Sequence, residues 1–156
     1  AVLGINPFDQ PNVQEAKDRT LDVLSGHGRG LTPDMATGGM GAVGNLLAEA
    51  HPPEYVAIQA FIDPDREGEL HAFVRQARET GAAVSVGLGP RYLHSTGQLH
   101  KGGPDTGLFV QVVDDLGEEL PIPGQKFGFR ALIKAQAAGD LQALEERGRR
   151  IVRVEL

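Results

Sequence analysis

The feature that most constrains the fold is a strand–helix–strand unit near the middle of the chain. Residues 55–62 form an apolar run of strand length with Gln59 as its one polar interior residue, which is typical of a strand buried on both faces. The sequence Asp-Pro-Asp at 63–65 favours a helix start, and we expect this helix to reach about Thr80 and to end at Gly81. A second strand is expected over 83–88. Such a unit joins neighbouring parallel strands through a crossover helix, so it predicts an α/β fold.

Further elements are expected on both sides of this unit. The sequence predicts strands over 1–5, 107–113 and 149–156, the last alternating and half-exposed like an edge strand. It predicts helices over about 10–24, 43–50, 127–138 and 141–147, with Gly139-Asp140 as the break between the last two. Polar or Gly-rich loops are expected over 27–44 and 89–106. We therefore expect a mostly parallel sheet flanked by helices.

Composition argues against several classes of function. The 156 residues carry 15 Lys and Arg against 21 Asp and Glu, a net charge of −6, whereas nucleic-acid binders usually carry the opposite sign. Cysteine is absent, which removes disulfides, thiolate zinc sites and thiol catalysis, and fits a reducing cytoplasm. No apolar run approaches the ~18–20 residues that span a bilayer. We expect a cytoplasmic protein that binds neither nucleic acid nor membranes.

Two patterns that suggest a cofactor or a metal lack the context they need. Residues 39–44, Gly-Met-Gly-Ala-Val-Gly, match the dinucleotide-binding fingerprint, but the preceding residues 31–37 are a poor strand. We therefore expect a surface loop there. The five histidines show none of the spacings typical of zinc ligands. The sequence predicts no cofactor and no metal.

The segment 89–103 carries the densest group of polar side chains. It holds His94, His100 and six further hydrogen-bonding residues, namely Arg91, Tyr92, Ser95, Thr96, Gln98 and Lys101. Glycines at both of its ends would let backbone N–H groups approach an anion. Structural loops seldom need so many titratable groups, so we interpret this segment as a ligand-binding loop.

Lys17 lies along the apolar stripe of the first expected helix, four residues from both Val13 and Leu21. One interpretation is that its amine extends to the surface while its stem covers apolar area. The other is that it meets an acidic or phosphorylated partner, because a cation near a helix N-terminus is disfavoured without one. The residues alone leave both open.

Two segments resemble a known family. Residues 4–17, Gly-Ile-Asn-Pro-Phe-Asp-Gln-Pro-Asn-Val-Gln-Glu-Ala-Lys, resemble the last active-site motif of glucose-6-phosphate isomerases, with Gln10 and Lys17 at the positions of its Gln and its catalytic Lys. Residues 89–103 and 120–156 resemble the C-terminal end of bacterial bifunctional transaldolase/glucose-6-phosphate isomerases. The resemblance implies that 1–50 end an isomerase domain and that 51–156 form a sugar-isomerase-like α/β C-terminal domain.

The resemblance also implies an activity and a set of roles. The reaction would interconvert glucose 6-phosphate and fructose 6-phosphate through an enediol, with Lys17 and a histidine opening the sugar ring. The run Ser-Thr-Gly-Gln-Leu-His at 95–100 is similar to the family's histidine motif and suggests His100, with His94 as the rival. Gln10, Arg91, Ser95, Thr96, Gln98 and Lys101 would contact the substrate.

The family's Ser/Thr phosphate loop and Glu base motif are not recognisable in the chain. We therefore expect a composite site completed by an upstream isomerase domain of the same protein, with a transaldolase domain or a homo-oligomer as possible additions. The isolated chain is then expected to be inactive. The alternative is a non-catalytic accessory or oligomerisation domain of a sugar-phosphate enzyme.

Overall fold

A four-stranded, all-parallel sheet forms the centre of the molecule in the computed structural model, which describes residues 11–26 and 38–156. Its strands are β1 (Tyr55–Phe61), β2 (Ala83–Leu88), β3 (Gly107–Val113) and β4 (Arg150–Glu155), in the order β2-β1-β3-β4. The central strands β1 and β3 are buried along nearly their whole length. The predicted α/β class, with a parallel sheet and an edge strand at the C-terminus, is confirmed.

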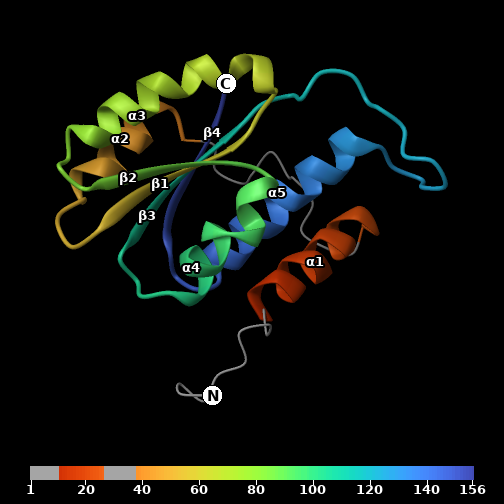
Figure 1. The fold of residues 1–156 in the computed structure, drawn as a ribbon, viewed down its shortest axis with the longest axis horizontal. Helices are drawn as coiled ribbons and strands as arrows, with labels where there is room; N and C mark the ends of the chain where they lie inside the picture. The colour runs from red at the N-terminus through yellow and green to blue at the C-terminus, as the bar shows by residue number, and fades with distance from the viewer. Residues whose placement is uncertain (1–10, 27–37) are drawn as a thin grey trace.

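Helices cover both faces of the sheet (Figure 1). Helices α2 (Met40–Ala48) and α3 (Leu70–Arg78) pack on one face, where Val43, Leu47 and Phe73 join the apolar side chains of the strands in one core. On the other face lie α4 (Thr96–Gly102) and α5 (Phe129–Glu145), and α1 (Pro11–Leu24) packs against the outer side of α5. Among the described residues, none of the helices is both long and apolar enough to cross a membrane.

The expected unit over 55–88 is present, with Asp63 accepting a hydrogen bond from the backbone N–H of Asp65 at 2.9 Å. Its helix opens as the 3-10 helix η1 (Pro64–Glu69) before α3 begins. The predicted strand over 1–5 lies outside the described residues, as does most of the loop predicted over 27–44. The described end of that loop is already helical, because α2 begins at Met40. The division into 1–50 and 51–156 stays a prediction.

The segment 89–106 is wrongly predicted as a loop. It folds into the 3-10 helix η2 (Arg91–His94) followed by α4. Two glycines permit close packing here. A Cβ at Gly97 of this segment would lie 3.1 Å from the carbonyl oxygen of Tyr92, and one at Gly87 on the neighbouring strand β2 would lie 2.8 Å from the Tyr92 Cβ. The polar residues of the segment therefore sit on short helices fixed against the sheet.

The expected helix break at Gly139-Asp140 is also wrong, because α5 runs without interruption from Phe129 to Glu145. Gly139 lies where α1 crosses α5, and a Cβ there would meet the Cβ of Arg19 at 3.3 Å and the backbone nitrogen of Thr20 at 3.4 Å. The glycine thus allows the two helices to approach each other closely. Asp140 is buried in the same helix and caps nothing.

The close approach of α1 and α5 can be tested with Gly139→Leu. A leucine has no room between Arg19 and Thr20, so we expect α1 to separate from α5, with a loss of about 1–3 kcal/mol in the free energy of unfolding, typical of overpacking. Hydrogen exchange of 11–26 should accelerate in this variant. Gly68→Leu is the control, because a Cβ at Gly68 would meet nothing within 4 Å. Unchanged exchange in α1 would contradict this account of the packing.

Candidate functional site

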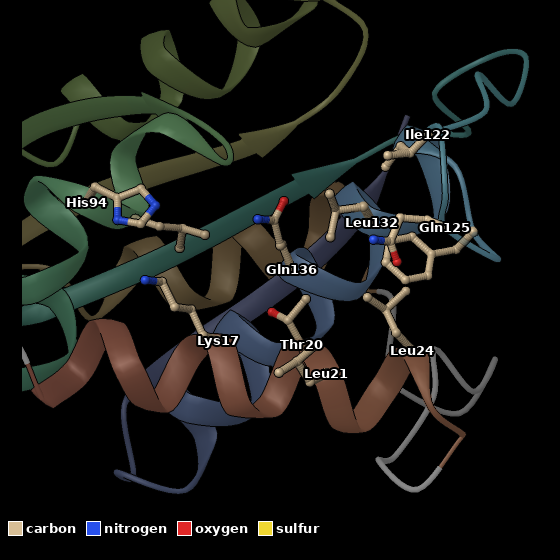
Figure 2. A pocket seen from close by; sticks show the side chains of 11 residues that line it. Lys17, Thr20, Leu21, Leu24, His94, Ile122, Gln125, Leu132 and Gln136 are labelled. Atoms are coloured by element: carbon tan, nitrogen blue, oxygen red, sulfur yellow. The ribbon is translucent and has the colours of Figure 1, made fainter.

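A cleft of about 520 Å³ lies between α1, α5 and the segment 114–128 that follows β3 (Figure 2). Its size falls within the range of small-molecule sites. The segments that follow the carboxyl ends of β2 and β3 supply part of its wall, and α1 and α5 supply the rest. It is lined by Lys17, Thr20, Leu21, Leu24, Leu93, His94, Ile122, Gln125, Phe127, Leu132 and Gln136.

Lys17 and His94 lie at the same end of this cleft, as Figure 2 shows, although they come from elements 77 positions apart in the chain. Both side chains are exposed. Among the described residues the lining contains one lysine, Lys17, and no Asp, Glu or Arg. The structure therefore brings together two of the predicted site residues in a position where they can meet an anion.

The remainder of the lining is mostly apolar. Leu24, Ile122 and Leu132 occupy the end away from Lys17, with Gln125 beside them (Figure 2). Gln136 of α5 lies between the two ends. Sequence reasoning missed the segment 114–128 as part of a site, because its composition is that of a turn. The signal that could have found it is a pair of large apolar residues, Ile122 and Phe127, in a stretch with little need for them.

His100 and Lys101 do not line the cleft, although both are predicted site residues. They lie on the inner side of α4, with only 4% and 2% of their surface exposed. The Lys101 amine forms a buried ion pair with Asp140, which also accepts a hydrogen bond from the Tyr92 hydroxyl at 2.6 Å. Asp140 thus joins α4, η2 and α5 in one buried polar cluster.

His100 is a core residue in this arrangement. Its Nδ1 lies 3.1 Å from the side-chain nitrogen of Gln59, which donates to it, and its ring packs among those of Tyr55, Tyr92 and Phe109. The pKa of His100 is lowered to about 4, mainly by burial. The Asp140 charge opposes this shift and the Lys101 charge adds to it. The ring is therefore neutral at pH 7.

Arg153 lies on the C-terminal strand that the sequence predicts to be half-exposed, yet its side chain is buried. It projects inward from β4, donating through Nε to the side-chain oxygen of Gln111 at 2.7 Å and through Nη2 to the carbonyl of Ala137 at 3.0 Å. Burial lowers the pKa of Arg153 to about 10. Gln59, Gln111 and Arg153 are register partners on adjacent strands, so they form a polar row across the α5 face of the sheet.

The other predicted site residues lie elsewhere. Arg91, Ser95 and Thr96 are exposed on η2 and at the start of α4, and Gln98 is partly buried, but none of the four lines the cleft. Gln10 lies outside the described residues. Within 11–26 and 38–156, no group of three or more His, Asp and Glu is placed to hold a metal ion.

The buried ion pair can be tested with Asp140→Ala. The change leaves the Lys101 ammonium and the Tyr92 hydroxyl buried without their acceptor, so we expect a loss of about 3–5 kcal/mol in the free energy of unfolding, measured with urea. Adding Lys101→Met should recover part of this loss. Asp115→Ala is the matched control, because Asp115 pairs with Lys134 at the surface and its loss should change the stability little. Equal losses for the two aspartates would contradict a buried, structural Asp140.

His100 predicts a pH dependence of stability. Because its folded pKa of about 4 lies below its ordinary value of 6.5, the stabilisation is fully present above pH 6.5 and is lost as the pH falls towards 4. At 1.36 kcal/mol per pKa unit, this corresponds to about 3 kcal/mol. Urea unfolding across this range should show a steeper fall for the native chain than for His100→Phe, which cannot titrate. Parallel curves would exclude a buried neutral histidine.

Comparison with known proteins bears on the fold. Neither a model of a known protein family nor a curated protein matches the sequence. The structure is similar to the crystal structure of a hypothetical protein from Thermus thermophilus, with a TM-score of 0.58 and 23% sequence identity. The match covers 93% of this chain and 37% of that protein, so the chain spans little more than a third of its length. At this identity the likeness shows a shared fold alone.

Proposed function

We propose that this chain is the C-terminal part of a cytoplasmic glucose-6-phosphate isomerase, which interconverts glucose 6-phosphate and fructose 6-phosphate. The resemblance of residues 4–17 to the isomerase motif supports the proposal, since it gives Lys17 a role at the sugar ring. The observation that carries it furthest is that Lys17 and His94 share one end of the cleft. A cation and an imidazole side by side suit a negatively charged substrate that needs proton transfer.

The reaction needs these two groups and a third one, a carboxylate base. Opening the ring needs a proton delivered to the ring oxygen and another removed from the hydroxyl at C1, which the Lys17 ammonium and the His94 imidazole would manage between them. Isomerisation then moves a proton between C1 and C2 through the enediol, a task for a carboxylate base. Within the described part of the chain no carboxylate lines the cleft, so that base would come from another part of the protein.

His94 suits the histidine role better than His100. His94 is exposed in the cleft, whereas His100 is enclosed by three aromatic rings and holds the Gln59 amide. A buried ring with a pKa of about 4 is poorly matched to proton exchange near pH 7. Gln10, Arg91, Ser95, Thr96 and Gln98 would contact the substrate in a larger site that another part of the protein completes.

A non-catalytic accessory or oligomerisation domain is the second candidate. The structural placement of His100 and Lys101 favours it, because two residues of the predicted ligand-binding segment then serve the packing of α4. Under this alternative, His94→Ala would leave turnover by the complete enzyme intact and would change only stability or assembly.

Lys17→Ala in the complete enzyme tests the proposal. We expect kcat for fructose 6-phosphate to fall about 10²–10⁴-fold, the range for loss of a positioned proton donor, while the melting temperature stays near that of the parent because Lys17 is exposed. A coupled assay for glucose 6-phosphate measures the rate. The isolated chain should show no turnover.

Lys126→Ala is the matched control, since Lys126 is an exposed lysine between two cleft residues but does not line the cleft. Its turnover should equal that of the parent. Full activity in Lys17→Ala would overturn the isomerase proposal, and full activity in His94→Ala alone would transfer the histidine role to another residue.

A further inference from the structure

The cleft has a pronounced polarity gradient that the isomerase proposal does not use. Lys17 and His94 occupy one end, and Leu24, Ile122 and Leu132 occupy the other (Figure 2). Leu21 lines the cleft while 61% of its surface is exposed, so part of the apolar wall is open to solvent. Apolar surface held open in a concave site is a common mark of ligand binding.

A sugar phosphate matches only one end of this gradient. Its hydroxyls, carried on almost every carbon, would lose their hydrogen bonds to water along a wall of Leu, Ile and Phe side chains. Such a ligand would therefore stay at the end that holds Lys17 and His94. The apolar end remains available to a ligand with a hydrocarbon or aromatic body.

Charge determines which ligand suits the end that holds Lys17. The chain as a whole carries a net charge of −6, yet among the described residues the cleft lining holds one lysine and no carboxylate. A ligand with an anionic group would meet the Lys17 amine without a competing acidic side chain from these residues. A cationic or uncharged ligand would gain nothing at that end.

We infer that the cleft binds amphipathic organic anions, with the anionic group at Lys17 and His94 and the apolar body along Leu21, Leu24, Phe127 and Leu132. A volume of about 520 Å³ accommodates a body of two or three rings. This inference goes beyond the isomerase proposal and does not depend on it, because it concerns binding by this chain alone. Such a ligand would compete with any phosphorylated substrate for Lys17.

Two fluorescent probes test separately the binding of the anionic group and the binding of the apolar body. 8-Anilinonaphthalene-1-sulfonate combines an aromatic body with a sulfonate, and N-phenyl-1-naphthylamine has the same body without the charge. We expect the sulfonate to bind the chain with one site per molecule and more tightly than the neutral probe. Lys17→Met should weaken sulfonate binding about tenfold, which is about 1.4 kcal/mol, and leave binding of the neutral probe unchanged. Leu21→Gln should weaken both probes several-fold.

Matched controls come from exposed residues that do not line the cleft. Lys126→Met removes the same charge as Lys17→Met, and Leu120→Gln makes the same change as Leu21→Gln at a leucine that is 63% exposed. Both should leave the two affinities unchanged, and thermal melting should confirm that all four variants are folded. These exposed positions make folding failure a poor explanation for any loss of binding.

Two results would overturn the inference. In the first, Lys17→Met and its control bind the sulfonate with equal affinity, so the anionic end is elsewhere. In the second, sedimentation shows a dimer that Leu21→Gln converts to monomer, so a second copy of the chain occupies the cleft. Neither result touches the isomerase proposal, which is decided by turnover of the complete enzyme.

Discussion

The buried carboxylate of Asp140 is the interaction on which the arrangement of the site depends. It receives the Lys101 amine from α4 and the Tyr92 hydroxyl from η2, and it is itself fixed in α5. A buried ion pair adds little net stability, but separating its two charges inside the protein is very costly. The pair therefore specifies one packing of these three segments. Because Tyr92 is held in this way, the next two residues, Leu93 and His94, are directed into the cleft.

The other wall of the cleft depends on a second constraint, the contact between α1 and α5. Gly139 removes the side chain that would keep the helices apart, and Arg19 then reaches Glu146 through two hydrogen bonds of 2.7 and 2.6 Å. This pairing carries Lys17 to the side of α5 that faces His94. The proposed site therefore rests on a buried ion pair and a close helix crossing. Of the residues that make these two contacts, Thr20 also lines the cleft.

The sequence predicts the described strands well because mostly apolar runs mark β1 to β3 and an alternating pattern marks β4. The predicted bounds of β2 and β3 match the observed ones. Prediction from the sequence fails at positions where the same residue type can occur in two different structural settings. Gly139 carries the usual signal of a helix break but serves a helix crossing, and Arg153 has the composition of a solvated edge but is enclosed by Gln111 and Ala137. Of the two histidines at 94 and 100, residue type alone cannot distinguish an exposed imidazole from a buried one. His100 contacts Gln59 and Tyr55, which are more than 35 positions away in the sequence.

On the α5 side of the sheet a polar row is buried beside two apolar clusters, and this bears on what the cleft can bind. Gln59, Gln111 and Arg153 form a polar row in the interior, where every charge needs a partner, while leucines line the open cleft beside α5. The interior polar groups make the packing specific, because a misplaced α4 would leave Lys101 buried without Asp140. The exposed part of a leucine such as Leu21 adds no hydrophobic stabilisation to the fold, because that surface is still in contact with water. A ligand that entered the cleft would cover this exposed leucine surface, and Lys17 at one end would favour a ligand with an anionic group.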